Sequence, residues 1–182
     1  MKTILIDVSS IDGKLTKWTG NNIYEWSSPE DFSHFKNTIA KNNLIVMGSG
    51  TFDKAKTVKK AGLKAEKGRL RIILTKTPQK YEHFKVPNQL EFSNESPKKL
   101  ITRLSKIGFK QMLLVSGGRV SSSFFKEKLI DELWLTIEPK IFGLGEPLIS
   151  KDKFNIELKL LSMDKLNSKG TILLKYSVLN NK

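Results

Sequence analysis

The chain has 182 residues, of which 38% are hydrophobic and 9% aromatic, and this predicts one folded domain of ordinary size. It has no cysteine, which excludes disulfides, thiolate metal sites and cysteine nucleophiles, and two histidines are too few for most histidine metal sites. The balance of 32 Lys and Arg against 18 Asp and Glu gives a net charge of +14. Such a charge favours nucleotides, phosphorylated metabolites, nucleic acid or acidic membranes as partners. The lysines are spread along nearly the whole chain, however, so charge alone selects none of these.

The chain is predicted to be cytoplasmic, with no membrane partner. No apolar run approaches the length of a membrane span. The apolar segment that follows Met1 is interrupted by Asp7, and no small-residue cleavage site follows it. It therefore predicts a first strand rather than a signal peptide.

Eight strands are predicted from short apolar or alternating runs. In chain order they cover residues 3–8, 44–47, 70–74, 89–92, 111–115, 132–138, 156–161 and 171–178.

Helical patterns lie between the earlier strands. Ser28 and Pro29 open the first helix as N-cap and first helical residue, and Phe32, Phe35 and Ile39 then share one face. A short helix is expected at Phe52, and another covers residues 119–126. Ser96 and Pro97 open a helix that Gly108 ends, and its core-facing residues are predicted to be Leu100, Ile101, Leu104 and Ile107.

The order of these elements predicts an α/β fold. Strands alternate with helices through the first two thirds of the chain, which favours a parallel sheet with crossover helices. Residues 132–178 hold three strands and no convincing helix, and residues 167–170 are typical of a hairpin turn. We therefore expect a single domain over residues 1–182, with a mostly parallel sheet of about eight strands and an antiparallel C-terminal portion.

The turn Ser116-Gly117-Gly118 is the strongest candidate for a ligand site. It joins a buried strand to a helix, where glycines allow positive φ and close approach of a ligand. The first amides of the helix have no intrahelical acceptor and can bind a phosphate. The alternative is a glycine turn without a ligand.

Two further segments follow buried strands in the same way. Gly48-Ser49-Gly50-Thr51 exposes backbone and a hydroxyl at a helix start, or is a plain capped turn. Thr75 and Lys76 place a hydroxyl and an ammonium where a strand leaves the sheet, or form a polar turn. Three such segments suit a dinucleotide with several phosphates, because ligands of open α/β sheets lie outside the carboxyl ends of the strands. Neither a P-loop nor the G-x-G-x-x-G pattern is present.

The order of these motifs resembles the dihydrofolate-reductase-like superfamily. It consists of residues 9–14 after the first strand, 47–51 after the second, 74–76 after the third and 116–119 before a helix. Residues 130–133, followed by Glu-Pro-Lys-Ile-Phe-Gly-Leu-Gly at 138–145, are similar to the branch that contains the RibD C-terminal domain, the reductase of riboflavin biosynthesis. The resemblance covers residues 4–178.

This resemblance implies NADPH as the cofactor. Thr75 and Lys76 would contact the 2′-phosphate of the cofactor. Lysine lacks the bidentate hydrogen bonding of arginine, so the preference for NADPH over NADH would be weaker. The remaining cofactor residues would lie along the other phosphates: Gly48, Ser49 and Thr51, with Ser116, Gly117, Gly118, Arg119 and Val120 around the pyrophosphate.

Asp31 is the candidate catalytic residue. It stands at the start of a helix, as does the acid that holds the pterin in true dihydrofolate reductases, but Ser28-x-x-Asp31 also fits a capping box. Asp31, Phe35 and Lys14 are the candidate substrate-binding residues. The alternative for Lys14 is a surface lysine.

The function expected from the resemblance is an NADPH-dependent reduction of a pyrimidine or pterin. A candidate substrate is 5-amino-6-(5-phosphoribosylamino)uracil or a related ribosylaminopyrimidine. Two departures weaken that substrate: Ser116 stands where riboflavin-pathway reductases usually carry glutamate, and the sequence has no deaminase domain with zinc ligands. The alternatives are a dihydrofolate reductase proper, or a non-catalytic basic nucleotide- or nucleic-acid-binding module. The sequence has no basic stripe interleaved with aromatic residues, and this argues against nucleic acid as a partner. A homodimer is expected by analogy with the riboflavin reductases.

Overall fold

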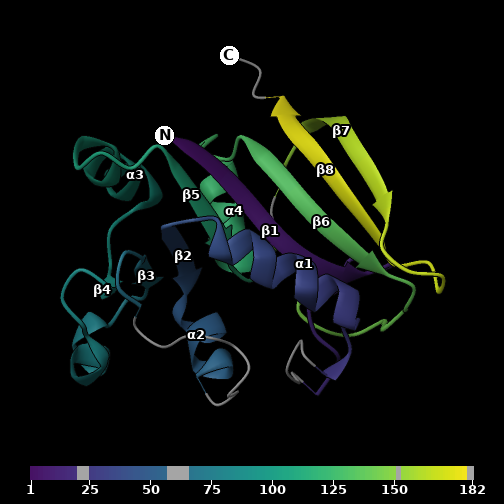
Figure 1. Ribbon diagram of the computed structural model, residues 1–182, viewed down its shortest axis with the longest axis horizontal. Helices are drawn as coiled ribbons and strands as arrows, with labels where there is room; N and C mark the ends of the chain where they lie inside the picture. The colour runs from purple at the N-terminus through teal and green to yellow at the C-terminus, as the bar shows by residue number, and fades with distance from the viewer. Residues whose placement is uncertain (20–24, 57–65, 151–152, 180–182) are drawn as a thin grey trace.

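One eight-stranded sheet organises the protein, in the order β4-β3-β2-β5-β1-β6-β8-β7. Figure 1 shows it in the computed structural model, which describes residues 1–19, 25–56, 66–150 and 153–179. The strands from β4 to β6 pair in parallel, and β8 and β7 are antiparallel. This confirms the predicted sheet. The strands are β1 (Lys2–Ser10), β2 (Leu44–Gly48), β3 (Leu70–Leu74), β4 (Leu90–Ser93), β5 (Gln111–Val115), β6 (Glu132–Glu138), β7 (Glu157–Lys165) and β8 (Ile172–Leu179).

The helices begin where the sequence predicts N-caps. The side chain of Ser28 accepts a hydrogen bond from the backbone of Asp31, and that of Ser96 accepts one from Lys99. Each cap is followed by proline at the first helical position. The helical elements are α1 (Pro29–Ala40), α2 (Ser49–Ala55), the 3₁₀ helix η3 (Pro78–Phe84), α3 (Pro97–Lys106) and α4 (Gly118–Lys126).

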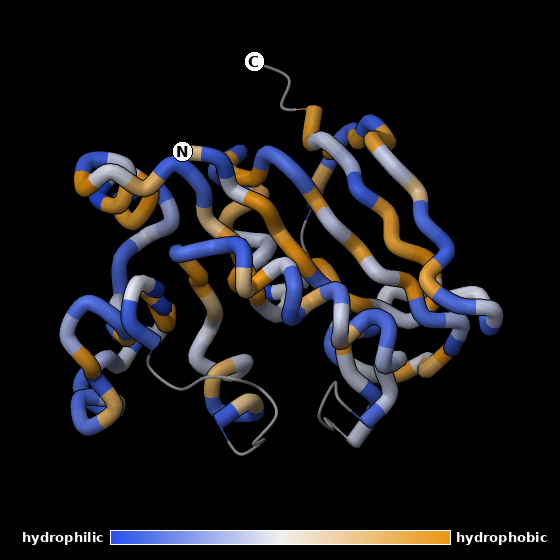
Figure 2. Tube along the Cα trace, in the orientation of Figure 1, coloured by the Kyte–Doolittle hydropathy of each residue, from blue (hydrophilic) through white to orange (hydrophobic). Residues whose placement is uncertain are grey.

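The central strands are buried on both faces, as their unbroken apolar runs require. Alternate residues enter separate clusters, so that Leu5 and Met112 face α3 and α4, whereas Ile4 and Leu113 lie in the cluster with Phe52 of α2. Ile39 of α1 packs against this second cluster. Figure 2 shows the apolar residues concentrated on these central strands.

Two details differ from the sequence prediction. Ile107 was expected to face the core but is 60% exposed, because α3 ends at Lys106 and Ile107 is its C-cap. The 3₁₀ helix η3 was not predicted; its Tyr81 stacks on Phe92 with ring centroids 4.9 Å apart. The hairpin turn was correct, since Leu166 donates to Thr171 across it and Gly170 has a φ of +98°.

The parallel pairing decides where a ligand can bind. Strands that run in the same direction end at the same edge of the sheet, so the segments after β2, β3 and β5 meet there. Among the described residues, no helix is long and apolar enough to cross a membrane.

Candidate active site

A cavity of about 1060 Å³ opens at the carboxyl ends of the parallel strands. It is lined by the ends of β1, β2, β3 and β5 and by the first turns of α1, α2 and α4. Every predicted site residue except Lys14 lies in its lining. These residues are Asp31, Phe35, Gly48, Ser49, Thr51, Thr75, Lys76, Ser116, Gly117, Gly118, Arg119 and Val120.

Two helices point uncapped N-termini at the cavity. The N-cap residues of α2 and α4 are Gly48 and Gly117, and neither makes a side-chain capping hydrogen bond. By contrast, the side chains of Ser28 and Ser96 cap α1 and α3. Within the described part of the chain, the first amides of α2 and α4 therefore have no capping side chain, and they lie at the positive ends of two helix dipoles, where an anion is stabilised.

The two glycines of the turn Ser116-Gly117-Gly118 have different structural roles from those expected. The positive φ that glycines allow is not used here: Gly117 has a φ of −72°, and Gly118 is not among the residues with positive φ. A Cβ on Gly118 would collide with the carbonyl oxygen of Pro147, so this glycine is required by packing of the chain on itself. A Cβ on Gly117 would enter open space, so only Gly117 leaves room beside the backbone for a ligand.

Ser116 is held in the fold by hydrogen bonds to α4. It is 2% exposed, and its hydroxyl lies 3.0 Å from that of Ser121 in α4. Ser121 in turn donates to the carbonyl oxygen of Ser116 at 3.2 Å. Ser116 thus fixes the turn between β5 and α4.

Lys14 lies in a loop beside the cavity rather than in its lining. Its backbone amide donates to the hydroxyl of Ser10 at 3.0 Å. The neighbouring Asp12 accepts hydrogen bonds from the backbone of Phe142 and Gly143, at 3.1 and 2.8 Å. This links the loop after β1 to the loop after β6. The proposed substrate contact of Lys14 stays a prediction.

Asp31 forms only half of the capping box that its sequence allows. Its backbone amide donates to the hydroxyl of Ser28 at 3.2 Å. The reciprocal bond would run from the Ser28 amide to the Asp31 carboxylate, but that amide donates instead to Glu138 Oε1 at 2.6 Å. Glu138 is 2% exposed, and its second oxygen accepts from Thr171 at 2.8 Å. The Asp31 carboxyl is therefore not used as a cap and lines the cavity.

The surroundings of Asp31 favour its protonated form. Burial raises the pKa of Asp31 to about 6, and the negative charge of Glu138 acts in the same direction. Hydrogen bonds with the side chains of Thr136 and Ser27 oppose part of this rise in pKa. A carboxyl that titrates close to neutral pH is suited to proton transfer.

Sequence reasoning missed a second carboxyl in this cavity, that of Asp7 on β1. Burial raises the pKa of Asp7 well above its ordinary value, and the charge of Asp31 raises it further. Its one signal in the sequence was an acid inside an apolar strand. Taken alone, this signal argues only against a signal peptide.

The cationic side chains of the lining come from the strand-end segments. Lys54 belongs to α2, Lys76 follows β3, and Arg119 belongs to α4. These are the segments predicted to meet phosphates, and positive charge there is electrostatically consistent with an anionic ligand. The described residues contain no group of three or more His, Asp or Glu that could hold a metal ion.

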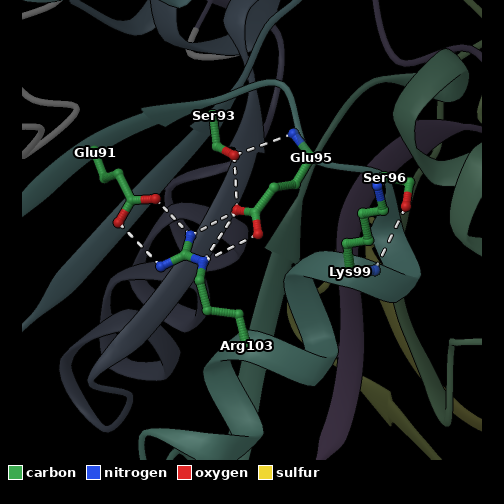
Figure 3. A network of polar contacts seen from close by, with 6 residues as sticks. All are labelled: Glu91, Ser93, Glu95, Ser96, Lys99 and Arg103. Carbon is green, nitrogen blue, oxygen red and sulfur yellow. Dashed lines mark hydrogen bonds and ion pairs between the residues drawn. The ribbon is translucent and has the colours of Figure 1, made fainter.

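One carboxylate, Glu95, lies among these cations but is held by Arg103 of α3 (Figure 3). The guanidinium donates from Nε to both oxygens of Glu95 at 3.1 Å and from Nη2 at 2.8 Å. Arg103 also binds Glu91, and Ser93 donates to Glu95 at 2.8 Å. The hydrogen bonds from Arg103 lower the pKa of Glu95, which is consequently ionised and already paired.

The fold and this strand-end cavity define a dihydrofolate-reductase-like α/β domain. Residues 2–172 match the RibD C-terminal domain family, and the chain belongs to this family. Over 174 residues it is 25% identical to the uncharacterized protein YwjB of Bacillus subtilis (strain 168), covering 93% of this chain and 90% of YwjB.

Solved structures share the fold at lower sequence identity. A protein from Shewanella sp. PV-4, whose name assigns it provisionally to riboflavin biosynthesis, is 21% identical with a TM-score of 0.79 and coverage of 99% of this chain and 100% of its own. A Thermotoga maritima protein is 18% identical with a TM-score of 0.76 and coverage of 97% and 56%. It is named diaminohydroxyphosphoribosylaminopyrimidine deaminase/5-amino-6-(5-phosphoribosylamino)uracil reductase.

The raised pKa of Asp31 predicts how D31N changes stability with pH. A carboxyl whose pKa is about 6 when folded and 3.8 otherwise stabilises the protein below about pH 4, and this contribution is lost as the pH rises through 6. The free energy of unfolding of D31N, relative to wild type, should therefore increase between about pH 4 and pH 8. The increase should be as much as about 3 kcal/mol.

Urea denaturation across this pH range measures the difference. Glu157→Gln, which removes an exposed carboxyl at the start of β7, serves as the matched control and should not reproduce the increase seen for D31N. If the difference in the free energy of unfolding between D31N and wild type stays constant with pH, Asp31 has no raised pKa in the folded protein.

Proposed function

We propose that this protein is an NADPH-dependent reductase that transfers a hydride to a pyrimidine- or pterin-type heterocycle. The observation that carries the proposal is the single cavity that joins two uncapped helix N-termini to a buried acid. A dinucleotide needs the first feature for its phosphates, and a reduction needs the second for its proton. Membership of the RibD C-terminal domain family supports the same function.

The cofactor residues are assigned by their place in this lining. Gly117, Gly118 and Arg119 at the start of α4 would hold the pyrophosphate, with Ser116 and Val120 beside them. Gly48, Ser49 and Thr51 of the second uncapped turn would bind the same phosphates or the adjoining ribose. Thr75 and Lys76 would meet the 2′-phosphate. When bound, the reduced nicotinamide supplies the hydride.

Asp31 is the proposed proton source, acting directly or through a water molecule that it orients. Its carboxyl lines the cavity, and its pKa of about 6 keeps a fraction protonated near neutral pH. Phe35 lies one helical turn further along α1 and also lines the cavity, where its ring can pack against a heterocycle. Lys14 is retained as a candidate for a phosphate or carbonyl of the substrate.

The first substrate to test is 5-amino-6-(5-phosphoribosylamino)uracil or a related ribosylaminopyrimidine. The Thermotoga maritima neighbour carries this substrate in its name, and the cavity combines acidic groups at α1 with cations at α2 and α4. Dihydropterins belong in the same screen, because reduction of these alone would make the protein a dihydrofolate reductase proper.

We also propose that the protein forms a homodimer through the edge strand β7. This strand ends the sheet and pairs with β8 alone, which leaves its outer edge open to a second chain. Its apolar side chains are exposed, with Leu160 at 50% and Met163 at 65%. Apolar residues gathered on an open edge are typical of a surface covered by a partner.

The central test is binding of NADPH and NADH to wild type and K76A. Wild type should bind NADPH more tightly, and K76A should lose about tenfold in NADPH affinity because a charge-assisted contact to the phosphate is removed. NADH affinity should change little. Isothermal titration calorimetry gives both affinities, and oxidation of NADPH with each heterocycle then identifies the substrate.

The matched control is K80A, which removes an exposed lysine of η3 that does not line the cavity. It should leave both affinities unchanged. If wild type fails to bind NADPH but binds oligonucleotides with a steep dependence on salt, the protein is a basic nucleic-acid-binding module and not a reductase.

The Arg103 network predicts a second effect on the cofactor. R103L removes the guanidinium partner of Glu95 and leaves its carboxylate without a cation in the lining that also contains Lys76, so NADPH affinity should fall more than NADH affinity. The added variant R103L/E95Q removes that carboxylate and should recover most of the NADPH affinity. Titration of all three proteins with both cofactors checks this. Equal losses for NADPH and NADH in R103L would mean that the network only supports the fold.

The dimer is tested by L160K, which would place like charges at the proposed β7 edge. Light scattering after size-exclusion chromatography should show a dimer for wild type and a monomer for L160K at the same concentration. I107K is the matched control, because Ile107 is 60% exposed at the end of α3, at the opposite end of the molecule (Figure 1). A wild-type monomer would contradict the proposal.

A further inference from the structure

Asp7 occupies an unusual place for an acid. It lies on β1, flanked by the buried apolar residues Ile6 and Val8. The ladder between β1 and β5 has its last pair at Leu5 and Leu114, whereas β1 continues along β6 with Asp7 opposite Leu135. Beyond that last pair, Asp7 and Ser116 both line the cavity. The acid therefore lies where β1 and β5 part.

The carboxyl of Asp7 has little to stabilise a negative charge. Its Oδ2 is enclosed and has no hydrogen-bond partner among the described residues. The side chain is otherwise only partly exposed, at the cavity. A buried carboxylate without hydrogen bonds is costly, and a neutral carboxylic acid is much less so.

Asp31 is the better placed of the two acids to carry the charge. Side-chain hydrogen bonds from Thr136 and Ser27 favour its ionised form, and Asp7 has no such hydrogen bond on Oδ2. The remaining charged groups of the lining are Glu95 and Glu146 and the cations Lys54, Lys76 and Arg119, and Glu138 of β6 acts on Asp31. Once Asp31 ionises, its charge opposes ionisation of Asp7.

We propose that Asp7 and Asp31 act as a carboxyl pair that holds one proton at neutral pH, with Asp7 as a second substrate-facing acid. This inference rests on the proposed reductase function. In neutral solution the cavity would present a carboxylate beside a carboxylic acid. A heterocycle could then donate hydrogen bonds from its N–H groups to the Asp31 carboxylate. Its carbonyl or imine group could accept a hydrogen bond from the Asp7 carboxylic acid.

The pair also accounts for the proton in the reduction. The substrate carbon gains the hydride of the reduced nicotinamide and forms a C–H bond. The π electrons of its C=N or C=O bond move to the heteroatom, which takes the proton of the pair. The pair is then left with two carboxylates, and their repulsion drives one to regain a proton from water. Asp7 keeps the pair supplied with a proton at pH values where Asp31 by itself would be ionised.

The first test uses the wild-type protein without cofactor. Carbon-13 NMR of labelled aspartate carboxyls should show one side chain still protonated at neutral pH, and D7N should lack this signal. In D31N the signal should remain but titrate at lower pH, because the repelling charge is gone. A wild-type spectrum with every aspartate ionised at that pH would overturn the proposal, even if NADPH binds.

The second test distinguishes a catalytic role from a structural one. D7N should unfold at a higher urea concentration than wild type at about pH 8, because the Asp7 carboxyl ionises freely in the unfolded chain above its ordinary pKa, whereas the folded protein holds it protonated. Its turnover at that pH should fall at least about tenfold, with a smaller loss at low pH where Asp31 is protonated. NADPH affinity should stay within about twofold of wild type, since no phosphate contact changes.

The control is again Glu157→Gln, which should change neither the signal of the protonated aspartate nor turnover. Lower stability of D7N at every pH would make Asp7 a structural residue. Failure of wild type to bind NADPH would instead remove the reductase function, while the carboxyl titration would still decide whether the pair exists.

Discussion

Parallel pairing of the central strands is the constraint on which the site depends. Six strands run in one direction from β4 to β6, so their carboxyl ends share one edge, and each following segment starts there. The N-termini of α2 and α4 are brought to this edge by the same connectivity. Because two helix dipoles and several strand-end side chains converge without any long-range sequence motif, the fold itself creates the proposed anion site.

The same edge of the sheet contains carboxyl groups that are costly to bury. Asp7 and Asp31 both lie in surroundings that favour their protonated forms, and Glu138 takes the amide hydrogen bond that would otherwise occupy Asp31. Arrangements of this kind lower stability and are retained where they serve function. By contrast, Glu95 is paired with Arg103, which keeps an acid compatible with the cationic side of the cavity.

Much of the fold was readable from local pattern. All eight strands were predicted, although β7 continues four residues beyond its predicted end, because strand periodicity and turn residues are properties of short segments. Ser28 and Ser96 marked helix starts for the same reason. The errors concern surroundings: Ile107 faces solvent because the helix stops before it, and Gly118 is small because Pro147 packs against it. Phe35 fits an amphipathic helix but lines the cavity.

By itself, the sequence determined the eight strands, the four α-helices and the three strand-end segments, since each depends on residues close together in the chain. The alternation of strands and helices also indicated a mostly parallel sheet, but not the order of its strands. Only the tertiary structure decided which acids face the cavity and in what state. Glu138 accepts a hydrogen bond from Ser28 across 110 positions, and the charge of Asp31 on α1 raises the pKa of Asp7 on β1. Such contacts depend on how β1, β6 and α1 pack, and the charge of a buried carboxyl follows from those neighbours rather than from its own position in the chain.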